Sequence, residues 1–183
     1  MIRNLNAILF IVLALFCGSC AELPVQLPAM PLDRVTPYFN EAAEVNTIDT
    51  SFYQVKNADG ELIGTLLFST PFTEEVKGYN GSTPLLIVLD AEDRITKVIL
   101  LPNKETPRFA DRVSNAGFYK SWNGLTVEEA LDKPVDAVTG ATYTSNGVKN
   151  TLTTRLKVYQ RQLQKDHNVK PSFWQRILGK LMK

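Results

Sequence analysis

Hydroxyl-bearing and small residues are concentrated in one short stretch of the chain, from Asp136 to Ser145. Four of the seven residues from Thr139 to Ser145 carry aliphatic hydroxyls, and Gly140 and Ala141 between them have little or no side chain. Hydroxyls and unshielded backbone amides are hydrogen-bond donors that suit an oxyanion. The stretch is therefore a candidate phosphate site, in which a threonine hydroxyl is also a candidate for a covalent bond.

A helix is predicted directly after this stretch. From Ser145 to about His167 the apolar residues recur at helical spacing, at Val148, Leu152, Leu156, Tyr159 and Leu163. This spacing makes Thr144 or Ser145 the expected N-cap. The first backbone N–H groups of a helix lack intrahelical partners and the helix dipole favours negative charge there, which makes such an end suitable for phosphate. The alternative is a capped helix behind a glycine turn, without a ligand.

The region before the motif is predicted to contain two hairpins. Each consists of two apolar runs around a short polar loop, 52–55 with 62–69 and 85–89 with 95–101. The first loop, 57–60, ends in the Asp-Gly pair that hairpins favour. The chain is therefore expected to have an α+β fold, mainly an antiparallel sheet built from hairpins, packed with a long C-terminal helix and shorter helices.

Two segments rich in turn residues, 78–84 and 102–107, are expected to be loops that line a cleft beside the hydroxyl motif. Thr126 and Glu129 have the spacing of a capping box, so a short helix is predicted to run to about Leu131. The aromatic residues just before it are expected in the core, namely Phe118 and Trp122.

The N-terminus has the features of an export signal. Arg3 precedes an almost wholly apolar run, 5–16, and the Gly-Ser-Cys triplet ending at Cys20 resembles the end of a bacterial lipoprotein signal, in which this cysteine is lipidated. The alternatives are an uncleaved anchor and simple secretion. We expect a signal peptide over residues 1–19 and a proline-containing tether over residues 20–36.

Charge is balanced along the whole chain but not at its end. The 183 residues include 20 Lys and Arg against 19 Asp and Glu. Residues 169–183 are expected to form a basic amphipathic helix that lies on the membrane surface, the alternative being docking onto the domain or a partner. No nucleic-acid partner is predicted, because no recognisable nucleic-acid module is present. No metal site is predicted either, since the single histidine, His167, stands among charged residues.

The sequence Asp-x-x-Thr-Gly-Ala-Thr at 136–142 resembles the covalent flavin attachment sequence of the FMN-binding domain family. That family includes flavoprotein subunits of the sodium-translocating NADH:quinone reductase and of the Rnf-type ferredoxin:NAD reductase. The resemblance implies that a separate flavin transferase, using FAD and magnesium, joins the FMN phosphate to the hydroxyl of Thr142 and releases AMP. It also implies that the transferase recognises Asp136. A threonine hydroxyl is a weak nucleophile, so the transferase would supply its activation.

Two upstream loops extend the resemblance, which covers the chain from about Phe52 to the long helix. They match the family's glycine-tyrosine loop and its Glu-Thr-Pro element, although Arg108 stands where the family commonly has glycine. The resemblance implies FMN contacts from Gly78, Tyr79, Glu105, Thr106, Thr139, Gly140, Ala141, Thr144 and Ser145. Taken alone, Tyr79 also fits a packed loop aromatic and Glu105 a solvated charge or a helix cap.

These features together predict an FMN-binding domain over residues 37–168, with covalent FMN, on the extracytoplasmic face of a bacterial membrane. The flavin would carry the chemistry, so the protein would relay electrons between redox partners that are membrane-associated proteins and would not convert a metabolite alone. The first alternative is an accessory FMN subunit of a membrane-bound Rnf-like or quinone-reductase-like complex with an uncleaved N-terminal anchor. The second is a structural or binding lipoprotein without a redox role.

Overall fold

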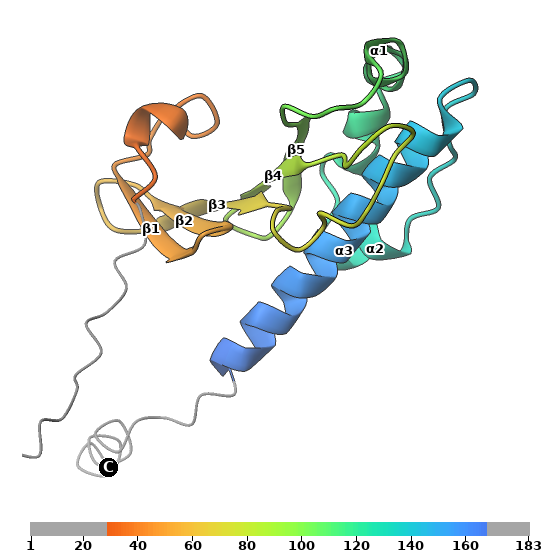
Figure 1. The fold of residues 1–183 in the computed structure, drawn as a ribbon. Helices are drawn as coiled ribbons and strands as arrows, with labels where there is room; N and C mark the ends of the chain where they lie inside the picture. The colour runs from red at the N-terminus through yellow and green to blue at the C-terminus, as the bar shows by residue number, and fades with distance from the viewer. Residues whose placement is uncertain (1–28, 168–183) are drawn as a thin grey trace, which may run out of the picture.

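The computed structural model describes residues 29–167 of the chain, and the side chains up to residue 164. The predicted signal peptide, the lipidated Cys20 and the predicted C-terminal amphipathic helix lie outside these residues. Figure 1 shows a sheet with the long C-terminal helix, in blue, on one side of it. The elements in chain order are η1 (Leu32–Arg34), β1 (Glu44–Asp49), β2 (Phe52–Lys56), β3 (Leu62–Phe68), β4 (Leu85–Asp90), β5 (Ile95–Leu100), α1 (Pro107–Asn115), η2 (Phe118–Trp122), α2 (Val127–Asp132) and α3 (Thr142–His167).

The five strands form one antiparallel sheet in the order β1-β2-β3-β4-β5. Both predicted hairpins are present, β2 with β3 and β4 with β5, and the α+β fold class is confirmed. Strand β1 was not expected from the sequence. It lies at the edge of the sheet and none of its residues is buried, so it lacks the alternation of buried and exposed residues that marks a strand.

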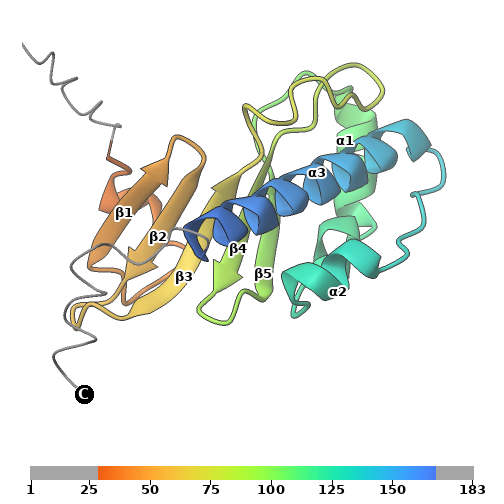
Figure 2. The same ribbon diagram turned by 90° about the horizontal axis from the view of Figure 1, so that it is seen from below.

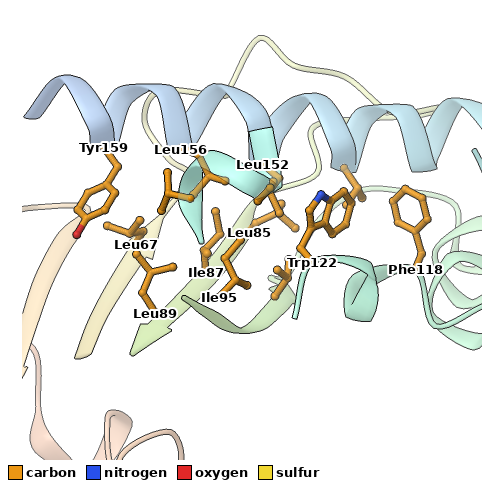
Figure 3. Packing of buried hydrophobic residues seen from close by; sticks show 14 of the residues in the cluster. Leu67, Leu85, Ile87, Leu89, Ile95, Phe118, Trp122, Leu152, Leu156 and Tyr159 are labelled. Carbon is orange, nitrogen blue, oxygen red and sulfur yellow. The ribbon is translucent and has the colours of Figure 1, made fainter. Parts of the chain in front are cut away.

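The face of the sheet that positions the candidate site is covered by α3 (Figure 2). Side chains that alternate along β3 and β4 pack on the helix, because successive residues of a strand point to opposite faces. Figure 3 shows Leu67, Leu85 and Ile87 facing Leu152 and Leu156 of α3, all fully buried. Phe118 and Trp122 of η2 extend the same cluster, as expected from the sequence. The long helix is thus packed on the sheet through Leu152 and Leu156.

The other face of the sheet is covered by the residues that precede β1. Val35 has no exposed surface and packs with Tyr53, Leu66 and Val88. The ring of Phe39 lies against Gly64, where a β-carbon would collide with it. Packing therefore reaches back into the segment predicted as a tether, while the division of the chain into tether and domain stays a prediction.

Arg155 of α3 is a buried cation that joins the helix to the sheet. Its guanidinium donates to the carbonyl oxygens of Phe68 (2.7 Å) and Ser51 (3.2 Å), and the side chain has no exposed surface. Burial lowers the pKa of Arg155 to about 10, and the negative charge of Asp49 opposes that shift. Arg155 is therefore a structural cation within the domain.

The shorter helices agree only in part with expectation. The capping box at the start of α2 is present, with Glu129 N bonded to Thr126 Oγ1 and Thr126 N bonded to Glu129 Oε2. Helix α1 differs from the expected loop, which ends where the helix begins, at Pro107. Proline is favoured at the first helical position, where its missing N–H has no intrahelical partner to lose.

Candidate functional site

The hydroxyl motif lies at the N-terminus of α3, but the helix begins earlier than the sequence predicted. Its first residue is Thr142, and Thr144 and Ser145 are buried in its first turn, so neither residue is the N-cap. The hydroxyl of Ser145 bonds instead to the carbonyl oxygen of Ala141 (2.9 Å) and accepts from the amide of Val138 (3.0 Å). The segment before the helix is thereby folded back onto its first turn.

The first turn of α3 presents unpaired backbone donors beside an exposed hydroxyl. The bond from Ser145 N to Ala141 O (2.9 Å) is the first of the helical ladder, so the amides of Thr142, Tyr143 and Thr144 precede it. Thr142 is exposed. Donors without partners and a positive helix end at the same place favour an anion there.

A hollow of about 180 Å³ opens next to this turn. Its walls combine the motif with two aromatic residues from other segments, and its lining residues are Tyr79, Phe109, Gly140, Ala141, Thr142, Tyr143 and Thr144. The rings of Tyr79 and Phe109 meet edge to face, 4.8 Å apart, and Tyr143 lies 6.4 Å from Tyr79. Tyr79 and Tyr143 are nevertheless 59% and 71% exposed. Large aromatic surfaces are therefore presented to solvent beside the anion-binding turn.

Glu105 holds the glycine loop and the helix together. The loops that follow β3 and β5 run toward the same end of α3 (Figures 1 and 2), and Glu105 is the link between them. One carboxylate oxygen accepts from the amides of Asn80 and Gly81 (2.8 Å each), and the other accepts from the Thr144 hydroxyl (2.6 Å). Glu105 as a whole is 6% exposed. Glu105 is thus neither a solvated charge nor a helix cap, the two simpler roles that the sequence left open.

The hydrogen bonds to Glu105 also set its charge. Burial alone raises the pKa of the Glu105 carboxyl, but the bonds from Thr144 and from the loop amides favour the anion. Together they outweigh burial, so the pKa lies below its ordinary value of 4.5. The carboxylate is therefore charged at neutral pH, and it keeps Tyr79 at the wall of the hollow by fixing the loop that carries it.

Gly147 allows the glycine loop to touch α3, and sequence reasoning did not identify it. A β-carbon at this helical position would stand 2.7 Å from the Cα of Gly78 and 3.0 Å from the carbonyl oxygen of Lys77. No side chain fits in that space. An isolated glycine within a helical pattern was the available signal, because such a glycine often marks a close approach of two segments.

Gly140 has a backbone conformation that favours glycine, and the side chain of Arg112 lies beside it. Its φ is +76°, in the left-handed region that favours glycine. A β-carbon there would also fall on the guanidinium group of Arg112, which extends from α1 across the motif. Arg112 Nη1 donates to the carbonyl oxygen of Thr139 at 3.4 Å. The turn before Thr142 thus has a cation beside it.

Replacing Gly140 with valine is expected to prevent flavin loading while leaving the domain folded. Left-handed backbone costs about 1–2 kcal/mol for a residue with a β-carbon, and the valine methyls would also displace Arg112. Gly60→Val is the matched control, because Gly60 has a φ of +81° in an open hairpin loop. Thermal melting should show similar losses for both variants, and in-gel flavin fluorescence after exposure to a flavin transferase should be lost in Gly140→Val alone. Equal loading of the two variants would contradict close approach at Gly140.

The remaining predicted site residues lie around this centre. Asp136 is exposed on a segment held at both ends, by Lys149 Nζ bonded to Val135 O (3.1 Å) and by the bond between Val138 and Ser145. Thr106 precedes α1, and its carbonyl oxygen accepts from the amides of that helix's first turn. Asp136 and Thr142 are both exposed, so a second protein can reach them. The assignment of FMN contacts to individual residues stays a prediction.

Two features are absent from residues 29–167. No helix in that range is long and apolar enough to cross a membrane. Within the same residues, no three side chains of His, Cys, Asp or Glu are grouped so that they could hold a metal ion.

Comparison with known proteins places the hydroxyl motif and both loops in a single matched region. The model of the FMN-binding domain matches residues 78–157. A subunit of the ion-translocating oxidoreductase complex from Stutzerimonas stutzeri is 31% identical over 142 residues, which cover 71% of this chain and 59% of that protein. The subunit of the same name from Shewanella piezotolerans is 26% identical over 126 residues, covering 63% of this chain and 57% of that protein. The matches thus span less than two thirds of these relatives' length.

Among solved structures, NqrC from Shewanella oneidensis aligns with a TM-score of 0.41 and 18% identity, covering 69% of this chain and 73% of that one. The region matched by the family model begins at the glycine loop and ends within α3, so it contains the first turn of the long helix, the Glu-Thr-Pro element and the residues that line the hollow. On this match, residues 78–157 of the chain belong to the FMN-binding domain family.

Proposed function

We propose that this protein carries flavin mononucleotide (FMN) bound covalently to Thr142 through a phosphoester and relays electrons as a membrane-tethered redox component. The observation that supports this most directly is the position of Thr142. Its exposed side chain stands at the N-terminus of α3 and at the wall of the aromatic hollow. A phosphate joined there would meet the helix's unpaired amides, while the attached ring system would reach the aromatic residues.

The residues of the hollow fit both ends of FMN. At the phosphate end, the amides of Thr142 to Thr144 are donors without partners, and Gly140 adds no side chain of its own beside them. At the flavin end, the rings of Tyr79, Phe109 and Tyr143 offer faces and edges to a flat aromatic group. Thr144 contributes its amide, while its hydroxyl is committed to Glu105. Glu105 contributes to the site by holding the glycine loop against α3, because its carboxylate oxygens accept hydrogen bonds from that loop and from Thr144.

Attachment requires a transferase and a flavin donor. The hydroxyl oxygen of Thr142 attacks the phosphorus on the FMN side of FAD, the bond from that phosphorus to the bridging oxygen breaks, and AMP leaves with that oxygen. The threonine proton passes to a base of the transferase, because the motif contains no histidine. Asp136, exposed on its fixed segment, is available for recognition by that enzyme.

Once bound, the flavin supplies the electron transfer, and this chain's residues hold it and define its surroundings. The exposed faces of Tyr79 and Tyr143 leave the site open toward a partner. Relatives are named as subunits of ion-translocating oxidoreductase complexes, which supports redox partners that are membrane-associated proteins. A covalent bond is advantageous outside the cytoplasm, where a lost flavin would not readily be replaced.

The processing of the N-terminus distinguishes a lipid anchor at Cys20 from an uncleaved N-terminal anchor. A lipoprotein is expected to begin at an acylated Cys20, because the Gly-Ser-Cys triplet follows an apolar run of signal-peptide length. Intact mass measurement of protein extracted from membranes checks this, and Cys20→Ser should abolish acylation. A mature chain that retains Met1 would instead support the membrane-anchored subunit.

The experiment that tests the proposed function is production of the full chain with and without an FAD-dependent flavin transferase. After denaturation and electrophoresis, the protein made with the transferase should fluoresce as a flavin protein, and the protein made without it should not. Absence of a covalent flavin in both would favour the structural or binding lipoprotein without a redox role.

A further inference from the structure

Arg112 extends from one helix to the turn at the start of another. It belongs to the exposed side of α1, yet its guanidinium lies against Gly140, where a β-carbon would displace it. Its Nη1 donates to the carbonyl oxygen of Thr139 at 3.4 Å, a long bond that leaves most of its donors unused. Arg112 is thus held beside the two residues that precede Ala141 and Thr142.

The charge of Arg112 has no carboxylate partner in the described part of the chain. The ion pair found there joins Arg94 to Glu129, away from this turn. Asp111 lines the same surface hollow as Arg112 but forms no ion pair with it within residues 29–164. Arg112 therefore adds a full positive charge beside a helix N-terminus with unpaired amides, where an anion would be favoured.

We propose that Arg112 binds the phosphate group of the flavin and gives the site its preference for phosphorylated flavins. This inference rests on the proposed FMN site but not on the covalent bond. The amides of α3 supply neutral donors to the phosphate, whereas Arg112 supplies a full charge and a planar set of N–H groups that match phosphate oxygens. Gly140 lets the guanidinium lie against this turn, because a β-carbon there would displace it.

The test measures non-covalent binding in a chain that cannot be loaded. Full-length Thr142→Ala protein is titrated with FMN and with riboflavin, which lacks the phosphate, and quenching of flavin fluorescence gives the two dissociation constants. Arg112→Gln is then added to this background. Arg161→Gln is the matched control, because Arg161 is also an exposed arginine bonded to a backbone carbonyl, that of Lys157, near the far end of α3.

Arg112→Gln should lower the ratio of FMN affinity to riboflavin affinity by about tenfold, since charge-assisted bonds to phosphate are among the stronger ones. Arg161→Gln should leave the ratio unchanged, and Arg112→Lys should give an intermediate ratio because it keeps the charge but loses the planar donor set. A purely structural role for Arg112 would lower both affinities together. An FMN preference that is absent from the Thr142→Ala protein, or that survives Arg112→Gln, overturns the proposal.

The binding test of Arg112 and the loading test of Thr142 can succeed or fail independently. If the wild-type chain takes up no covalent flavin but the FMN preference depends on Arg112, the attachment is refuted and the phosphate site stands. If Thr142 is loaded but the preference does not depend on Arg112, the attachment stands and the assignment of Arg112 is refuted.

Discussion

Thr142→Ala is expected to abolish covalent flavin completely while leaving the fold and its stability nearly unchanged. Thr142 is exposed at the first position of α3, where its side chain contributes no packing to the core. Alanine also favours the helix. Loss of the hydroxyl removes the only atom that can form the proposed phosphoester. The measurement is in-gel flavin fluorescence after production with a flavin transferase, with a thermal melt of each protein.

Two variants make this result specific. Thr142→Ser keeps a hydroxyl at the same position and should retain some loading. Thr139→Ala removes the other exposed threonine of the motif, whose backbone carbonyl but not its hydroxyl is bonded to Arg112, and should still be loaded. Covalent flavin on Thr142→Ala would refute the attachment site. Its loss from Thr139→Ala with retention on Thr142→Ala would move the bond to Thr139.

Glu105→Ala is expected to have the largest effect on stability, lowering the free energy of unfolding by about 3 kcal/mol. The substitution leaves the amides of Asn80 and Gly81 and the buried Thr144 hydroxyl without their acceptor, and an unsatisfied buried donor costs about 1–3 kcal/mol. The glycine loop should then leave α3 and carry Tyr79 away from the hollow. Chemical denaturation measures the stability, and flavin loading measures the loss of the site.

Three comparisons isolate the contribution of the carboxylate. Thr144→Val removes one of the three hydrogen bonds and should cost about 1 kcal/mol. Glu105→Gln keeps an acceptor for the loop amides and should fall between Glu105→Ala and the wild type. Glu61→Ala, at an exposed loop glutamate bonded to Asn57, should change stability by less than about 0.5 kcal/mol. A Glu105→Ala protein as stable as Glu61→Ala would refute the role of Glu105 as the link between loop and helix.

The same carboxylate predicts a pH dependence. The pKa of Glu105 is lower in the folded protein than its ordinary value of 4.5, so the unfolded state binds the proton more readily. The stability that Glu105 provides is therefore fully present above about pH 4.5 and is lost as the pH falls through the lowered pKa. The stability difference between wild type and Glu105→Gln should be constant from pH 7 to 5 and shrink below that. A difference that widened on acidification would have the wrong sign.

The hairpins were predictable because their signals are local. The Asp-Gly pair between β2 and β3 and the apolar runs beside it are close together in the sequence, and so is the capping box of α2. Strand β1 was missed because an exposed edge strand needs no regular burial pattern. Helix α1 is not evident from the sequence because proline both breaks helices and suits their first position, so Pro107 alone does not distinguish a loop from a helix start.

The surroundings of the hydroxyl motif could not be predicted, because they are formed by contacts between residues far apart in the sequence. The start of α3 was placed too late because Thr144 and Ser145 have the composition of caps, whereas their hydroxyls are bonded to Glu105 and to the segment before the helix. Glu105 and Thr144 are 39 positions apart, and Arg112 and Thr139 are 27 apart. The motif itself was recognisable from its residues. Its surroundings required the fold.

The most direct test of the attachment is the mass of the peptide that contains Thr142, taken from full-length protein produced with a flavin transferase. Digestion and tandem mass spectrometry should find one FMN, less one water, on that peptide, with the fragment ions placing it on Thr142. Flavin mapped to any other residue, or an unmodified peptide from protein exposed to a transferase that modifies a known substrate in parallel, would contradict the account.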